Sequence, residues 1–364
     1  MKRPDTPRLR ARQAGRARRA TLAWIVALVA LLPAACGGDG RDVLIVYSPH
    51  GRDLLTHYEM AFEALHPEVD VQWVDMGSQE VLDRLRSERA NPQADVWFGA
   101  PEQMFEVATE EGLLEPFRPT WADVLPPEAR DPDGHWHGTY LTPEVLAYNE
   151  DAVSREEAPA DWDDLLDPRW RGQVILREPM ASGTMRTIFS HIIYRESEGT
   201  GDPTAGYEWL LRLDAQTREY ALNPTLLYQK LARQEGLVTM WAMPDILALR
   251  ATTGLPINYR LPEGGTPVVV DAVAVVSGSG NPEAARAFVE FVGNRESILE
   301  ATERFFRIPA RTDIPPEEFP EWLQADLPQI RPMEADRALL RERTSEWMRY
   351  WDDRIRRRGA REGY

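Results

Sequence analysis

Strand-like and helix-like segments alternate three times in the 70 residues that follow Asp42, and this alternation constrains the fold most strongly. Val43–Tyr47 is a continuous β-branched and aliphatic run of the kind that forms a strand buried on both faces, and Val69–Val74 and Asp95–Phe98 are predicted as the second and third strands. Each run is followed by a segment whose apolar residues recur at helical spacing. Strands that alternate with helices form a parallel sheet with crossover helices. The sequence therefore predicts an α/β fold.

The alternation resumes after a proline-rich connection that ends at Pro132. Gln173–Leu176 and Leu237–Trp241 are predicted strands, and a helix is expected after each of them. Val268–Val276 is the longest β-branched run in the chain and predicts a further strand. A second α/β unit is therefore expected after the first.

We interpret this order of elements as two lobes, each a mainly parallel sheet flanked by helices, with a ligand cleft at the hinge. Residues 42–148 and the returning segment 268–311 would form the first lobe, and residues 149–267 the inserted second lobe. The chain would cross between the lobes near Tyr148 and near Val268. A C-terminal helical region, residues 312–364, is expected to pack on the first lobe.

The first 36 residues have the features of an export signal. Eight basic residues and one acid precede a 12-residue apolar run, Thr21–Leu32, which is shorter than the roughly 20 residues that span a bilayer. Pro33-Ala34-Ala35-Cys36 then resembles the lipobox of bacterial lipoproteins, although Pro33 replaces the usual apolar residue. The resemblance implies lipidation of Cys36 and a location in the periplasm or on the outer face of the cytoplasmic membrane. The alternative is an ordinary signal peptide cut near Ala35, which leaves a free thiol.

Charge and cysteine content exclude several classes of protein. The whole chain has a formal charge of −17 and residues 1–36 carry +7, so the remaining chain carries −24. Such an acidic surface disfavours nucleic acid as a partner. Cys36 is the only cysteine, so no disulfide within the chain is possible. The sequence holds no phosphate-binding, dinucleotide-binding or hydrolase motif, which disfavours an enzyme and predicts no cofactor; catalysis by scattered carboxylates is the enzymatic alternative.

From Val43 to about Arg311 the order of motifs resembles the type II periplasmic binding proteins of ABC importers. The nearest resemblance is to the branch that includes iron(III)-, phosphonate- and sugar-phosphate-binding proteins. The motifs that carry it are Val46-Tyr47-Ser48, Ala94-Asp95-Val96-Trp97, Gly112-Leu113-Leu114-Glu115-Pro116, Tyr148-Asn149, Asp164-Leu165-Leu166-Asp167-Pro168-Arg169-Trp170-Arg171-Gly172, Pro179 with Ser182-Gly183-Thr184, and Asn281-Pro282-Glu283-Ala284-Ala285-Arg286-Ala287-Phe288-Val289. The resemblance implies an ABC permease and its ATPase as partners, and we expect a monomer.

The candidate ligand contacts lie where strands end and helices begin, because unpaired backbone N–H groups there suit an anion. Small polar or glycine residues in such loops can contact an anion closely, although Ser78 and Ser182 would serve equally well as helix caps. The candidates are Ser48, His50, Gly51, Ser78, Ala100, Ser182, Gly183, Thr184, Trp241 and Asp271.

Three of these candidates have specific alternatives. His50 is a possible contact to ligand or metal, but a lone histidine is more often a polar loop residue. Trp241 stands at a strand end and could form a wall of the cleft, whereas strand aromatics usually belong to the core. Asp271 is an acid in an apolar strand, so it requires a partner, either a ligand amine or the hinge backbone.

Metal binding is not the preferred prediction. The iron(III) relatives are expected to use a pair of neighbouring tyrosines, and the corresponding stretch, Met243–Leu249, contains none. Ala100 stands where an acidic ligand is expected. His135 and His137 share one face of a strand, but two histidines do not complete a site. A small oxyanion or organic phosphate is therefore preferred, with iron(III) at a non-standard site or presentation of the ligand to a sensor as alternatives.

The mechanism implied by two lobes is hinge closure. Ligand contacts that both lobes make exist only in the closed form, so the ligand would shift the population toward it.

Overall fold

The computed structural model describes residues 40–358 of the chain. The predicted export signal and the lipidation site at Cys36 lie outside these residues. Within the described part, no helix is both long and apolar enough to cross a membrane.

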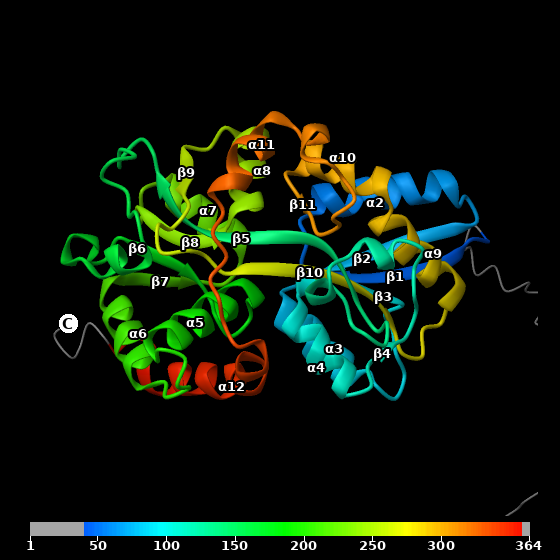
Figure 1. Ribbon diagram of the computed structural model, residues 1–364, viewed down its shortest axis with the longest axis horizontal. Coiled ribbons are helices and arrows are strands. Elements are labelled where there is room, and N and C mark those ends of the chain that lie inside the picture. Colours follow the sequence, from blue (N-terminus) through cyan, green and yellow to red (C-terminus); the bar gives the residue numbers. More distant parts are fainter. Residues whose placement is uncertain (1–39, 359–364) are drawn as a thin grey trace, which may run out of the picture. The chain divides into compact units, whose positions relative to one another are not determined.

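The first lobe begins with the predicted strand–helix alternation. Its first three strands are parallel neighbours in the order β2-β1-β3, and helices cover both faces, as Figure 1 shows. The apolar faces of the helices predicted from spacing are buried, as with Leu54, Leu55, Tyr58 and Phe62. The elements are β1 (Asp42–Ser48), α2 (Arg52–Leu65), β2 (Val69–Asp75), α3 (Ser78–Ser87), β3 (Val96–Pro101), α4 (Glu102–Glu110) and β4 (Leu114–Glu115).

The second lobe also alternates strands and helices. Strands β8, β6 and β7 are parallel neighbours, but β5 (His137–Asn149) pairs with β8 and β9 in antiparallel fashion. The sheet is therefore mixed, and the prediction of a mainly parallel sheet was wrong, because the strands that cross between the lobes pair antiparallel. Two of its elements, α6 and β7, were not predicted. The elements are β6 (Val174–Arg177), α5 (Gly183–Glu196), α6 (Thr204–Gln216), β7 (Thr217–Ala221), α7 (Pro224–Ala232), β8 (Val238–Ala242), α8 (Met243–Thr253) and β9 (Ile257–Arg260).

Two long strands connect the lobes, and both run across the middle of Figure 1. β5 (His137–Asn149) pairs with β10 (Val268–Val276) up to Pro143, and with β8 and β9 from Glu144 onward. The change of neighbours falls five residues before the predicted crossover at Tyr148, whereas β10 starts at the predicted Val268. The resulting order β2-β1-β3-β10-β5-β8-β6-β7 belongs to the 11-stranded sheet that residues 40–358 form.

After β10 the chain returns to the first lobe through α9 (Pro282–Gly293), α10 (Arg295–Phe305) and β11 (Ile308–Pro309), the last of which pairs with β5. The Asn281 and Asn294 side chains accept hydrogen bonds from Ala284 and Ser297 N–H and so cap the two helices. Both helices therefore begin where the sequence provides a capping residue.

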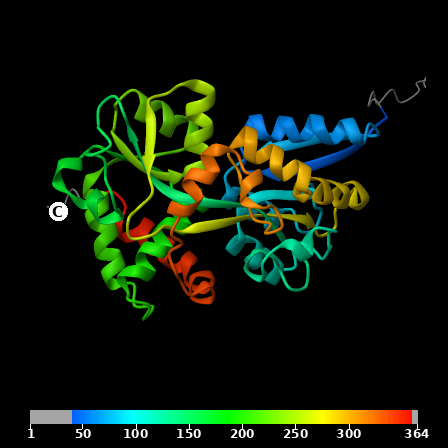
Figure 2. The same cartoon turned by 45° about the horizontal axis from the view of Figure 1, so that its top comes forward.

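The C-terminal region does not pack on the first lobe alone, so that prediction was wrong. It runs from α11 (Glu321–Asp326) across the molecule to α12 (Arg337–Tyr350), which contacts both α5 and α4 (Figures 1 and 2). The following π-helical turn η7 (Trp351–Ile355) packs against α6, where Trp351 is fully buried. The short 3₁₀ helices are η1 (Ala122–Val124), η2 (Pro127–Ala129), η3 (Trp162–Leu166), η4 (Pro168–Trp170), η5 (Pro316–Glu318) and η6 (Leu327–Gln329).

Candidate functional site

The two lobes touch where the helices α3, α4 and α5 begin. A Cβ atom added to Gly77, just before α3, would lie 2.5 Å from the carbonyl oxygen of Ala181 in the second lobe. A Cβ added to Gly183 would lie 2.7 Å from Pro101 and 3.0 Å from the Ser78 hydroxyl. Glycine is therefore required at both positions for this close approach, and the cleft is closed at this point.

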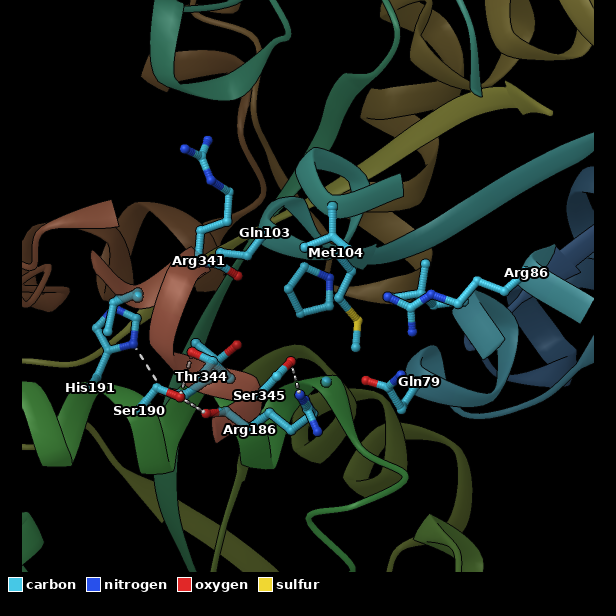
Figure 3. Close-up of a pocket in the computed structure, with 16 residues that line it drawn as sticks. Gln79, Arg86, Gln103, Met104, Arg186, Ser190, His191, Arg341, Thr344 and Ser345 are labelled. Carbon is cyan, nitrogen blue, oxygen red and sulfur yellow. Dashed lines mark hydrogen bonds between the residues drawn. The ribbon is translucent and has the colours of Figure 1, made fainter. Parts of the chain in front are cut away.

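A small cavity lies beside this contact. It is lined by residues from two or more turns of each of α3, α4 and α5 and by α12, and Figure 3 shows Gln79, Gln103, Arg186 and Ser345 around it. Its volume of about 60 Å³ has room for a few water molecules and not for a sugar phosphate. The cavity in this conformation is therefore too small to hold a solute of that size.

Arg186 is the buried charge of this cavity. Its side chain, on the first turn of α5, donates a hydrogen bond to the Ser345 hydroxyl on α12 at 3.2 Å. Burial lowers the pKa of Arg186 to about 10. A guanidinium that is buried against a neutral hydroxyl is a favourable partner for an anion.

A second group of polar side chains lies deeper, on the crossing strands. Tyr140, Thr142 and Glu144 alternate along β5 and therefore share one face of the strand. The Thr142 hydroxyl donates to the Asp271 carboxylate at 2.5 Å, and the Ala100 N–H donates to the same carboxylate at 3.4 Å. Asp271 therefore has the partners that the sequence required, from the crossing strand β5 and from the end of β3.

Glu144 is the most unusual member of this group. Its side chain is fully buried, and neither carboxylate oxygen has a hydrogen-bond partner among residues 40–358. Burial, and then the charges of Asp271 and Asp245, raise the pKa of Glu144 well above its ordinary value. Leaving such a group unpaired costs about 1–3 kcal/mol, so an unpaired buried carboxyl calls for a functional explanation.

Asp245, on the first turn of α8, pairs with the buried Arg307 at 3.1 Å. Trp241 at the end of β8 donates its indole N–H to the other oxygen of Asp245, also at 3.1 Å. Burial by itself would lower the pKa of Arg307, but Asp245 and Asp271 raise it overall. Arg307 precedes β11 in the returning segment and Asp245 belongs to the inserted stretch, so this ion pair joins the two lobes.

His50 lies at the first-lobe end of the same group. Its ring packs edge-on against Phe98 and Tyr140, and its Nε2 lies so close to Gly99 that a Cβ there would be 2.5 Å away. Burial, followed by the charge of Arg307, holds the pKa of His50 well below its usual range, so the ring is neutral. Within the described chain, Nε2 has no hydrogen-bond partner and can accept or donate one to a ligand.

The end of β3, which contacts both His50 and Asp271, is strained. Ala100 has a φ of 119°, a conformation that residues with a side chain rarely adopt. This conformation directs the Ala100 N–H to Asp271 while Pro101 contacts Gly183. The two groups of candidate residues therefore meet at Ala100–Pro101. Strained backbone conformations often occur in binding sites.

The structure brings together most of the predicted contacts and separates one. His50, Ala100 and Asp271 belong to the deep group, and the buried Ser48 hydroxyl accepts the N–H of His50. Gly51 is exposed, and a Cβ added there would meet nothing within 4 Å in the described structure. The other predicted residues line the helix starts or the second-lobe wall, namely Ser78, Ser182, Gly183, Thr184 and Trp241.

The two serines take different roles. The Ser182 hydroxyl accepts the N–H of Met185 and caps α5, which is the structural alternative for this residue. Ser78 was wrongly expected to cap α3; it is the first helical residue, and Gly77 occupies the cap position, where its N–H donates to Glu80. The buried Ser78 hydroxyl therefore points toward Gly183 and not toward its own helix.

Tyr140, Glu144, Asp245 and Arg307 were missed. Glu144 carries a weaker form of the signal of Asp271, because it is the lone acid in a long extended segment that also holds His137, Thr139 and Thr142. Arg307 and Asp245 are 62 residues apart, so no local sequence pattern indicates that they pair.

Across residues 40–358, no three histidine, cysteine or acidic side chains are grouped so that they could hold a metal ion. His135 instead pairs with Asp131 at 2.9 Å, and His137 packs edge-on against Trp121.

Two α/β lobes joined by crossing strands, with polar groups from both lobes at the cleft, define a type II periplasmic binding protein. The chain belongs to the family described as bacterial extracellular solute-binding proteins, whose model matches residues 91–327.

Curated relatives of several kinds are similar to the chain. A probable ABC transporter periplasmic-binding protein of Sinorhizobium fredii is 29% identical over 79% of this chain and 80% of its own length. Iron uptake protein A1 of Synechocystis is 26% identical over 68% of this chain and 70% of its own length. A putative 2-aminoethylphosphonate-binding periplasmic protein of Salmonella typhimurium is 24% identical over 81% of this chain and 82% of its own length.

Solved structures share the fold. The periplasmic binding protein AfuA of Actinobacillus pleuropneumoniae, with fructose-6-phosphate bound, superimposes with a TM-score of 0.75 at 23% identity, over 87% of this chain and 99% of that one. Iron-bound HitA of Pseudomonas aeruginosa gives a TM-score of 0.72 at 22% identity, over 86% of this chain and 99% of that one.

Proposed function

We propose that this protein captures a small anionic solute, an organic phosphate, a phosphonate or a similar oxyanion, by closure of its two lobes, and delivers it to an ABC permease. The observation that carries the proposal is the convergence of α3 and α5 at Ser78 and Gly183, next to the buried Arg186. Helix N-termini and an unneutralised guanidinium favour negative charge over neutral or cationic groups. The relatives named for phosphonate and for sugar phosphate agree with this class of solute.

In this function residues 42–148 with 268–311 would act as one lobe and residues 149–267 as the other. Contacts such as Gly77–Ala181 and Asp245–Arg307 join these two stretches and exist only when they are close together. A solute held between them would stabilise the closed form through its differential contacts. The closed pair of lobes would then be the form that the permease recognises.

Thermal unfolding of the mature protein with a panel of ligands tests this function. The panel includes phosphonates, sugar phosphates, sulfate, Fe(III) and neutral sugars. A true ligand at 100 times its Kd adds about 2.7 kcal/mol to the free energy of unfolding. Stabilisation by Fe(III) or by neutral sugars, and by none of the oxyanions, would overturn the anionic class.

We also propose that Cys36 carries the lipid that holds the protein at the membrane. The single cysteine after a short apolar run is the sequence feature that supports this. Cell fractionation of a Cys36→Ser variant should move the protein from the membrane to the soluble exported fraction. Unchanged fractionation would indicate a conventional signal peptide.

A further inference from the structure

The buried polar group on the crossing strands is chemically different from the helix starts and is not suited to an anion. It contains the carboxyl groups of Glu144, Asp271 and Asp245, against the single guanidinium of Arg307. Arg307 is paired with Asp245 at 3.1 Å, and His50 is neutral. The charges that act on Glu144 are those of Asp271 and Asp245, both negative, so Glu144 itself has no cation beside it in the described structure.

Glu144 provides the observation that points to a ligand. It is fully buried on the crossing strand β5, on the same face as Thr142, which holds Asp271. In the described part of the chain both of its oxygens lack a donor. A primary ammonium has three N–H donors and can serve two carboxyl groups at once. It would supply both the missing donors and the missing positive charge.

A ligand contact at Glu144 would depend on closure of the two lobes, because of the position of Glu144 in β5. β5 changes its neighbours between Pro143 and Glu144, so Glu144 stands where the chain passes from one lobe to the other. Ala100, whose N–H faces Asp271, is followed directly by Pro101, which touches Gly183 at the start of α5. The carboxyl groups and the helix starts are therefore connected through two consecutive residues, Ala100 and Pro101.

We propose that Glu144, together with Asp271, binds a protonated primary amine of the captured solute. The solute would then be a small molecule with an ammonium group and an oxyanion group. This inference rests on the proposed function, because it places the amine in the same cleft that takes the anion.

Isothermal titration with matched probes tests the inference. The pairs are 2-aminoethylphosphonate with ethylphosphonate, and glucosamine 6-phosphate with glucose 6-phosphate; putrescine is an amine with no anion. In at least one pair the amino compound should bind at least tenfold more tightly than its partner, which corresponds to about 1.4 kcal/mol of binding free energy. Glu144→Gln should remove this preference and leave the affinity for the compound without the amine unchanged. Glu68→Gln, at an exposed position, should leave both affinities unchanged.

The outcomes separate the inference from the proposed function. Equal affinity within both pairs overturns the amine contact and leaves the anionic class intact. Tight binding of putrescine that Glu144→Gln abolishes supports the amine contact and overturns the anionic class. Absence of binding by every probe overturns both for these compounds. If Glu144→Gln does not fold, the preference of the unaltered protein within each pair still decides the matter.

Discussion

The guanidinium of Arg337 on α12 lies 3.2 Å from the carboxylate of Glu102, the first residue of α4. On the same helix, Thr344 donates a hydrogen bond to the Ser190 hydroxyl of α5 at 2.9 Å. α4 belongs to the stretch assigned to the first lobe and α5 to the stretch assigned to the second. One helix therefore joins both lobes at the edge of the cavity (Figure 3). The family model ends at residue 327, so this connection lies outside the matched region.

We predict that Arg337→Ala with Arg341→Ala shifts the ligand-free protein toward an open form. Arg341 lies within 3.8 Å of Glu106 and 3.4 Å of Glu110, so the double variant removes the ion pairs between α12 and α4. Partly exposed pairs contribute up to about 1 kcal/mol each. Small-angle scattering should show a larger radius of gyration, and ligand association should be faster.

Arg343→Ala is the matched control, because Arg343 pairs with Glu346 within α12 itself. It should leave the radius of gyration and the association rate unchanged. Equal expansion of both variants would mean that the helix is merely destabilised and that its contacts with α4 do not hold the lobes together.

A second prediction concerns the contact between the lobes at Gly77. A Cβ at this position would overlap the Ala181 carbonyl at 2.5 Å, so Gly77→Ala should prevent full closure. Ligand affinity should fall at least tenfold, while the midpoint of thermal unfolding without ligand should change little. Titration calorimetry measures the first quantity and calorimetric melting the second.

Gly51→Ala controls for the loss of a glycine at a helix start. Gly51 also precedes a helix and has a similar φ of −66°, but a Cβ there would meet nothing within 4 Å in the described structure. Its affinity should equal that of the unaltered protein. Full affinity in Gly77→Ala would show that ligand binding does not require this contact.

The sequence predicted the fold in detail because its signals are local. Strands buried on both faces are continuous apolar runs, so β1, β3 and β10 were located within a few residues. Asp271 was identified because an acid in such a run must have a partner. A weaker form of the same argument applies to Glu144.

The remaining site residues depend on contacts between distant segments. Arg307 meets Asp245 only after the returning segment has packed beside β5, through β11. The position of α12 depends on pairings such as Arg337 with Glu102, which are 235 residues apart. Helical spacing predicts that a helix forms there, but it does not determine which of two lobes the helix contacts.

A third prediction concerns Ala100, whose φ of 119° is strained. For a residue with a side chain, such a conformation costs the folded state about 1–3 kcal/mol. Glycine adopts it without strain, but the greater entropy of the unfolded chain with glycine lowers stability by about 0.4–1 kcal/mol. Ala100→Gly should therefore increase the free energy of unfolding by about 1 kcal/mol. Ala108→Gly, inside α4 and fully buried, should decrease it by about the same amount. Urea denaturation compares the two, and destabilisation by Ala100→Gly would contradict the strain.

The last prediction is a loss of stability in acid that depends on His191. This side chain is buried, belongs to α5 and lines the cavity. Its Nδ1–H donates to the Thr187 carbonyl at 2.9 Å. Burial lowers the pKa of His191 to about 4, against 6.5 for the unfolded chain. The unfolded chain therefore binds the proton first, and stability is lost as the pH falls from 6.5 to about 4, by up to about 3 kcal/mol. Urea denaturation across this range should show a shallower pH dependence for His191→Gln than for the unaltered protein. His137, whose pKa burial also lowers to about 4, should account for a second part of the slope in a His137→Gln variant. An identical slope in His191→Gln would mean that the pKa of His191 is the same in the folded and unfolded protein.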